Sequence, residues 1–251
     1  MADELRFETP EPGIAVLTLH RPERLNALNA PLMEQLDAAL GRVRDDADLR
    51  VCLLRGAPRT NGTPCFSAGV DLKAFAEGQG VGFQPGIRIT DTLAALPKPT
   101  IAVIDGVCTT GGAELAVACH LRLVAPTARI SDWHLRKLGT GLGAWGASTR
   151  WARLVGAART RELFLTGREI DGEEALRIGF ASRLVPSASL FETALSLARE
   201  IATLDPRGVA MTLAHLARVD DQSEAQALAF AAQAPDWFGI QPDLGQDPGA
   251  E

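Results

Sequence analysis

The chain lacks an excess of basic residues and a long apolar run, two features that mark large functional classes. Its 251 residues include 25 Lys and Arg against 31 Asp and Glu, for a net charge of −6. A nucleic-acid surface would need clustered excess cations, and a membrane span would need roughly 20 consecutive apolar residues. The first ten residues also carry no secretory signal pattern. We therefore expect a cytoplasmic protein with neither nucleic-acid nor membrane partners.

Cysteine is scarce as well, and its placement argues against a metal centre. The four cysteines lack the spacing of metal ligands and sit among apolar neighbours, so we expect reduced structural thiols and no metal site; they are Cys52, Cys65, Cys108 and Cys119. What the chain does have is apolar content, at 46%. A chain of this length and composition buries a large core.

Apolar periodicity in the first two thirds predicts alternating strands and helices. Ile14–Leu19 and Val51–Gly56 have the pattern of buried strands, and they flank an amphipathic helix predicted over Ala30–Arg44. Further strands are predicted at Thr100–Ile104 and Leu121–Ala125. Repeated strand and helix crossovers of this kind indicate an α/β fold.

After Trp145 the pattern becomes mostly helical. The predicted helices cover Gly146–Leu154, Thr160–Leu165, Gly172–Ile178, Ser189–Thr203 and Arg207–Arg218. The alanine-rich stretch Ala225–Ala234 favours burial, whereas the residues after Gln241, rich in Pro, Gly and acids, predict a disordered tail.

Two glycine-marked turns carry the functional signal. In Ile101–Glu114 a strand-like run breaks at Gly111 and Gly112 and opens an apolar helix that carries a carboxylate at Glu114. Free N–H groups at such a helix start form an oxyanion site, and Glu114 is a candidate acid/base beside it. The second turn lies in Cys65–Phe75.

Five ordered motifs resemble those of the crotonase, or enoyl-CoA hydratase/isomerase, superfamily; they are HRPERLNALN (20–29), FSAGVDL (66–72), KPTIAVIDG (98–106), GGAELAVACHLRL (111–123) and LFLTGREIDGEEALRIGFASRLV (163–185). The resemblance implies a spiral core of ββα turns over residues 1–190. It also implies a helical oligomerisation region over residues 191–251, which includes the tail, and a homotrimer or a dimer of trimers. No prosthetic group is expected, because coenzyme A enters as part of the acyl-CoA substrate.

Matching the motifs residue by residue gives the site that the resemblance implies. The backbone N–H groups of Val70 and Gly111 would bind the thioester oxygen as an enolate forms, with Glu114 as acid/base. For coenzyme A, the implied contacts are Arg24 to the phosphates and a cradle for the adenine, formed by Ala68, Asp71 and Leu72. The expected activity is hydration or isomerisation of an unsaturated acyl-CoA thioester.

One position departs from the hydratase pattern. Relatives that hydrate double bonds carry a second glutamate, and here His134 falls in its place. His134 could substitute as acid/base, or Glu114 could shuttle a proton alone in an isomerase. Alternatively, Asp132 or His134 could activate a water that cleaves a carbon–carbon bond of a cyclic diketone-type substrate, or the two could be a structural loop pair. A non-catalytic acyl-CoA binding protein is the alternative outside enzymes.

Tryptophans gather around the same segment. Trp133, Trp145 and Trp151 fall where the family places the wall of its acyl pocket, so they either shape that pocket or fill core volume. His120 occupies a position where relatives commonly carry aspartate, and we expect it to replace a structural hydrogen bond.

Overall fold

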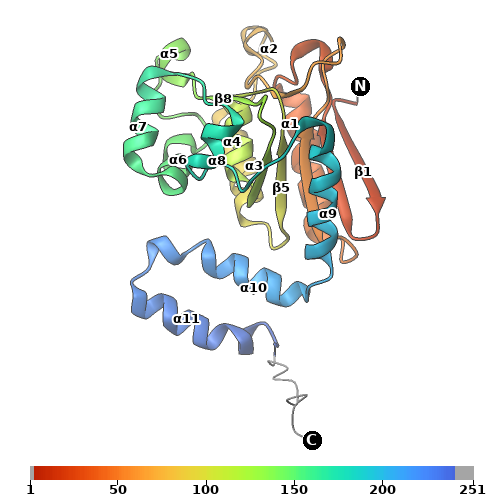
Figure 1. Cartoon of the computed structure of the whole chain (residues 1–251), viewed down its shortest axis with the longest axis vertical. Coiled ribbons are helices and arrows are strands. Elements are labelled where there is room, and N and C mark those ends of the chain that lie inside the picture. The colour runs from red at the N-terminus through yellow and green to blue at the C-terminus, as the bar shows by residue number, and fades with distance from the viewer. Residues whose placement is uncertain (1–2, 241–251) are drawn as a thin grey trace, which may run out of the picture.

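A six-stranded sheet lies at the centre of the main body in the computed structural model, which describes residues 3–240 (Figure 1). The strand order is β1-β2-β3-β5-β7-β9, with β1 antiparallel to β2 and every other neighbouring pair parallel. The strands are β1 (Leu5–Glu11), β2 (Ile14–Leu19), β3 (Val51–Gly56), β5 (Thr100–Ile104), β7 (Leu121–Val124) and β9 (Arg183–Leu184). The strands predicted from periodicity are confirmed.

A second, parallel sheet consists of three short strands in the order β4-β6-β8, namely β4 (Cys65–Ser67), β6 (Val107–Thr109) and β8 (Arg129–Ser131). Each of them follows a strand of the large sheet and precedes a helix. The chain therefore repeats a strand–strand–helix unit, which is the ββα arrangement that the family resemblance implied.

Helices cover both faces of the large sheet. Alternate side chains along each strand point to opposite faces, so each face has apolar side chains to bury. One face packs against α1 (Ala30–Asp45), α3 (Phe83–Ala95) and α4 (Gly111–Ala118). The other packs against α9 (Leu190–Ala202), which covers Val16, Leu53, Val103 and Leu123 among others. The boundary expected at residue 190 thus falls at the start of α9, and the main body continues through Ala202.

Shorter helices complete the main body: α2 (Leu72–Ala76), α5 (His134–Leu138), α6 (Ala147–Val155), α7 (Ala157–Thr166) and α8 (Gly172–Arg177), with 3₁₀ turns η1 (Pro22–Arg24) and η2 (Ser187–Ser189). The helices predicted after Trp145 are confirmed to within a few residues.

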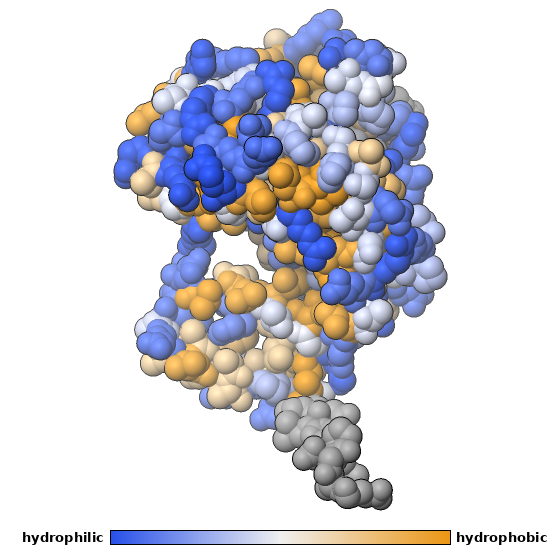
Figure 2. Space-filling view, in the orientation of Figure 1, coloured by the Kyte–Doolittle hydropathy of each residue, from blue (hydrophilic) through white to orange (hydrophobic). Residues whose placement is uncertain are grey.

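A helical hairpin projects from the main body at the C-terminal end (Figure 1). It contains α10 (Pro206–Leu216), η3 (Val219–Asp221) and α11 (Glu224–Trp237), and His215 stacks on Phe230 between the two long helices. Figure 2 shows apolar side chains on the hairpin and on the body across the groove that separates them. A cavity of about 340 Å³ lies between Leu49 and Pro97 of the body and Leu204 and Val209 near α10. The expected disordered tail lies outside the described residues.

Candidate active site

The first glycine turn follows β4 and is fixed by Ser67. The Ser67 hydroxyl donates to the Asn26 carbonyl (2.8 Å) and accepts the N–H of Gly69 (3.2 Å). Gly69 has a φ of +86°, and a Cβ there would overlap the side chain of Thr110 in the second turn. Glycine is therefore needed both for the backbone conformation and for the close approach of the two turns.

The second turn joins β6 to α4. Strands β4 and β6 pair in parallel, with Ser67 opposite Cys108. The two turns therefore begin at neighbouring strand ends and lie side by side. Gly111 is the first residue of α4, so its N–H has no acceptor within the helix. Val70 directly follows the turn residue Gly69 on the other strand. The structure thus brings Val70 and Gly111 to one place.

Glu114 is completely buried on α4, with an exposed fraction of 0%. Its Oε1 accepts three backbone N–H groups, those of Ala144 (3.0 Å) and Trp145 (2.6 Å) in the loop before α6 and that of Ala147 (3.2 Å), the first residue of α6. Its Oε2 has no hydrogen-bond partner among the described residues. One oxygen is therefore held in place, and the other is available for chemistry.

His134 faces that second oxygen. Its Nε2 lies 3.6 Å from Glu114 Oε2, and its Nδ1 is 2.7 Å from Asp132 Oδ2. Asp132 Oδ1 also accepts the backbone N–H of His134 (3.1 Å). Both oxygens of Asp132 are thus bound to His134, which places a proton on Nδ1 when the imidazole is neutral and turns Nε2 toward Glu114. The sequence signal for His134 was its position twenty residues after Glu114, where the hydratase pattern has its second glutamate.

The environment shifts both acid/base candidates in the same direction. Burial raises the pKa of the Glu114 carboxyl, against the opposing effects of His134 and the backbone N–H groups. For His134, burial acts to lower the pKa, but the hydrogen bond and charge of Asp132, with the charge of Glu114, outweigh it and raise the pKa above the ordinary value. Each group therefore holds a proton more readily than in water.

A cavity of about 440 Å³ opens beside this cluster, a size typical of ligand sites. Val70, His134 and Trp145 line it. Of the three tryptophans considered above, Trp133 and Trp151 do not line it. Trp151 fills core volume, stacked on Phe180 at 4.6 Å between ring centroids, and Trp133 donates its indole N–H to the Gly167 carbonyl (3.0 Å).

The residues implied for coenzyme A gather on one side of the first turn. The N–H of Ala68 donates to the Leu25 carbonyl (3.0 Å), which places Arg24, in η1, next to Ala68. The carboxylate of Asp71 accepts the N–H groups of Lys73 and Ala74 at the start of α2. Leu72 begins that helix and is exposed.

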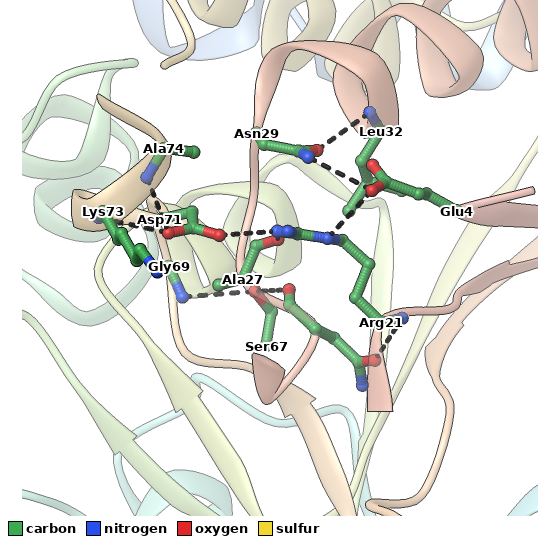
Figure 3. A network of polar contacts seen from close by, with 11 residues as sticks. Glu4, Arg21, Ala27, Asn29, Leu32, Ser67, Gly69, Asp71, Lys73 and Ala74 are labelled. Atoms are coloured by element: carbon green, nitrogen blue, oxygen red, sulfur yellow. Dashed lines mark hydrogen bonds and ion pairs between the residues drawn. The ribbon is translucent and has the colours of Figure 1, made fainter. Parts of the chain in front are cut away.

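A buried arginine supports this side of the site, and sequence reasoning missed it. The Arg21 guanidinium lies 2.9 Å from Asp71 Oδ2 and 3.2 Å from Glu4 Oε1, and it donates to the Ala27 carbonyl (2.6 Å) (Figure 3). Asn29, which caps α1, donates to Glu4 as well (3.2 Å). The network links the N-terminal strand to the α2 start that follows Val70.

Residues 3–240 contain no cluster of three or more side chains suited to a metal ion. Across the same residues, no helix combines the length and the apolar character that a membrane crossing requires.

Comparisons with known proteins agree with this geometry. A sequence profile described as "Enoyl-CoA hydratase/isomerase" matches residues 9–238. The short-chain-enoyl-CoA hydratase of Clostridium acetobutylicum is 31% identical over 230 residues, which cover 89% of this chain and 85% of that protein. The crystal structure of an enoyl-CoA hydratase from Bacillus anthracis matches with a TM-score of 0.85 at 28% identity, covering 93% of this chain and 90% of that one.

An isomerase is similar as well. A monofunctional enoyl CoA isomerase from M. smegmatis matches with a TM-score of 0.75 at 30% identity, covering 90% of this chain and 98% of that one. Sequence, repeating ββα units and paired glycine turns therefore lead to one conclusion: the chain belongs to the enoyl-CoA hydratase/isomerase family of enzymes, within the crotonase superfamily.

Proposed function

We propose that this protein adds water to the double bond of an unsaturated acyl-CoA thioester. The observation that carries the proposal is the buried His134–Glu114 pair, whose His134 lines the cavity together with Val70. Hydration needs a base for the water and an acid for the carbon skeleton. The pair supplies both, although the second glutamate of the hydratase pattern is absent.

The oxyanion site carries the charge that develops during the reaction. The N–H groups of Val70 and Gly111 bind the thioester oxygen, which becomes negative when water attacks the β-carbon and an enolate forms. Losing one such donor typically costs about 2.7–4 kcal/mol of transition-state stabilisation.

The acid/base pair works with one shared proton. The deprotonated member takes a proton from the attacking water, and the protonated member delivers its own proton to the α-carbon, which gives a 3-hydroxyacyl thioester. Asp132 orients His134 and stabilises its cationic form through the 2.7 Å contact with Nδ1. Asp132 is thus a positioning residue, and its contacts do not favour a direct attack on a diketone substrate.

Isomerisation is the second candidate, because Glu114 keeps one oxygen free while three N–H groups hold the other. In that reaction Glu114 alone would remove a proton from one carbon of the acyl chain and return it to another. His134 would then affect the rate only through the pKa of Glu114.

Coenzyme A enters as the thioester portion of the substrate. We propose that Arg24, which is exposed in η1, meets its phosphates, and that the segment of Ala68, Asp71 and Leu72 receives the adenine. The carboxylate of Asp71 is already bound to Arg21 and to the start of α2, so its contribution there is to shape the backbone of the cradle.

We further propose a homotrimer or a dimer of trimers assembled through the hairpin of α10 and α11. Leu216 on α10 is 59% exposed, and Leu228 and Trp237 on α11 are both 62% exposed. Apolar side chains grouped on a projecting element favour an interface between subunits.

Turnover of crotonyl-CoA by the purified protein tests the proposed activity. Hydration would remove the absorbance of the conjugated enoyl thioester and form 3-hydroxybutyryl-CoA. An isomerase would instead convert a 3-enoyl-CoA to its 2-enoyl isomer without adding water. Binding of both esters with no chemical change would refute the proposal.

A further inference from the structure

Thr110, the residue between β6 and α4, has a backbone conformation that threonine rarely adopts. Its φ is +48° and its ψ is −119°. These angles belong to the first inner position of a type II′ turn, where glycine is usual, and they are strained for a β-branched side chain. Among residues 3–240, the other non-glycine residues with positive φ are Leu25 and Asn26. Strain of this kind persists only where the surroundings impose it, and it concentrates at functional sites.

Hydrogen bonds hold the backbone of Thr110 on both sides. Its N–H donates to the Ser131 carbonyl of β8 (3.1 Å), and its carbonyl accepts the N–H of Glu114 (2.9 Å), which begins the hydrogen bonding of α4. The ψ of Thr110 also orients the peptide unit that carries the Gly111 N–H. The strained conformation therefore sets both the direction of that N–H and the start of the helix that carries Glu114.

The side chain of Thr110 packs against the first glycine turn. A Cβ added to Gly69 would overlap Thr110 Oγ1, so this hydroxyl fills the space directly over the Gly69 Cα. The hydroxyl also makes a long hydrogen bond to the Ala68 carbonyl (3.5 Å). Nearby, a Cβ on Gly112 would lie 2.7 Å from the Ser67 carbonyl oxygen. The two turns thus meet at two points, Thr110 against Gly69 and Gly112 against Ser67.

Val70 lies directly after this contact. Leu28 and Val70 form an isolated bridge, in which the Leu28 N–H donates to the Gly69 carbonyl (2.8 Å) and the Asp71 N–H donates to the Leu28 carbonyl (2.9 Å). This pairing does not use the N–H of Val70 itself. The position of Gly69, against which Thr110 packs, therefore decides where the Val70 N–H points.

We propose, on the basis of the oxyanion site and the hydratase function above, that Thr110 is a positioning residue that sets the separation and the angle between the N–H groups of Val70 and Gly111. Its backbone orients one donor, and its hydroxyl over Gly69 holds the other. Oxyanion donors act because they are fixed before the charge develops. A looser pair binds the substrate almost as well but stabilises the enolate less, so the side chain of Thr110 contributes to kcat and not to KM.

Thr110→Gly tests this role, because glycine adopts the same φ and ψ without strain but leaves the space over Gly69 empty. We expect a folded variant whose kcat for crotonyl-CoA falls about tenfold, part of the loss that removal of a whole donor causes, with little change in KM. Thr110→Ser keeps the hydroxyl and should stay close to the wild type. A wild-type kcat in Thr110→Gly, or a Thr110→Ser variant as slow as Thr110→Gly, would overturn the proposal.

An infrared measurement reports on the oxyanion site without turnover. Butyryl-CoA labelled with carbon-13 at the thioester carbonyl has no double bond to hydrate, and N–H donors on its oxygen lower the C=O stretching frequency of the bound ester. The shift should be the same in the wild type and Thr110→Ser and clearly smaller in Thr110→Gly. An equal shift in all three proteins, or none in the wild type, would refute the role of Thr110. If the shifts follow the expected order but the wild type leaves crotonyl-CoA unchanged, the hydratase function fails and the role of Thr110 stands.

A double-mutant cycle tests the contact between the turns. Gly69→Ala should lower kcat because its Cβ would overlap Thr110 Oγ1, and the same substitution should lower kcat by a smaller factor in a Thr110→Gly background. Some loss should remain there, because Gly69 has a φ of +86° and the Thr109 carbonyl oxygen would lie 2.9 Å from the new Cβ. Equal factors in the two backgrounds would show that Thr110 does not act through Gly69 and would overturn the proposal.

Discussion

At the scale of single residues, Glu114 is the group whose loss should matter most. Glu114→Gln keeps an oxygen for the N–H groups of Trp145 and Ala147 but removes the proton carrier, so we expect kcat to fall about 10²–10⁴-fold. Binding of the CoA ester should persist. Because burial raises the pKa of Glu114, its ionised form disfavours folding at neutral pH, and the neutral glutamine should preserve or raise Tm. Turnover close to that of the wild type would contradict the assignment.

The shared proton of His134 and Glu114 predicts a bell-shaped pH profile for kcat/KM. The rate should fall at acid pH, where both groups are protonated and no base remains, and at alkaline pH, where both are deprotonated and no acid remains. Asp132 raises the pKa of His134, so the alkaline limb should lie above about 6.5, the ordinary imidazole value.

Variants of Asp132 and His134 show which residue produces the alkaline limb of the pH profile. Asp132→Asn removes the charge that favours imidazolium, so the alkaline limb should move to lower pH. His134→Glu should move it further toward acid pH, and His134→Ala should abolish it. Full activity and an unchanged profile in both Asp132→Asn and His134→Ala would leave Glu114 acting alone and favour the isomerase.

Motif matching could locate residues but not their contacts. It pointed to Glu114 and His134 as candidates, yet it could not show that both carboxylate oxygens of Asp132 bind His134. The expectation for His120 is confirmed, since its Nδ1 accepts the N–H of Thr100 (3.0 Å). Arg21 escaped notice because nothing local distinguishes a buried arginine from an exposed one.

At the scale of elements, the loop from Gly139 to Gly146 determines where Glu114 is held. Gly143 has a φ of +76°, and a Cβ there would lie 2.8 Å from Glu114 Oε1 and 2.5 Å from Ala147 Cβ. Gly143→Ala should therefore displace the carboxylate and lower kcat at least tenfold.

Gly139→Ala is the matched control for that loop. Gly139 has a similar φ of +70°, but nothing lies within 4 Å of an added Cβ. Both variants share the strain of a left-handed alanine, so both should lower Tm, and Gly143→Ala should lower it more because its Cβ also clashes with Ala147. Only Gly143→Ala should lower kcat. Equal kinetic defects would show that strain, not contact with Glu114, limits activity.

Sequence patterns predicted strands β2, β3, β5 and β7 and helix α1, but they missed the seven-residue strand β1, the short strands of the second sheet and the 13-residue helix α3. Strands of three residues, β4, β6 and β8, are too short to show a period. Helix α3 was missed because Pro85 and Gly86 lie in its first half and Ile and Thr follow, all weak helix formers. Packing imposed the helix there, and its Gly86 is the residue that admits Trp145.

At the scale of the whole molecule, the exposed hairpin predicts the assembly state. We expect light scattering at micromolar concentration to give the mass of a trimer or of two trimers. Leu216→Asp combined with Leu228→Asp should shift the protein to smaller species, because a carboxylate at a buried apolar contact is costly. A wild-type monomer would contradict the proposal.

The position of α9 has a consequence for how the chain is made. The outer face of the large sheet, with Val16, Leu53 and Val103, is covered by a helix that begins only at Leu190. During synthesis, roughly the first three quarters of the chain therefore leave the ribosome with that apolar face uncovered, a state prone to aggregation. Ribosome-bound chains that stop short of α9 should recruit chaperones, and those that include it should release them.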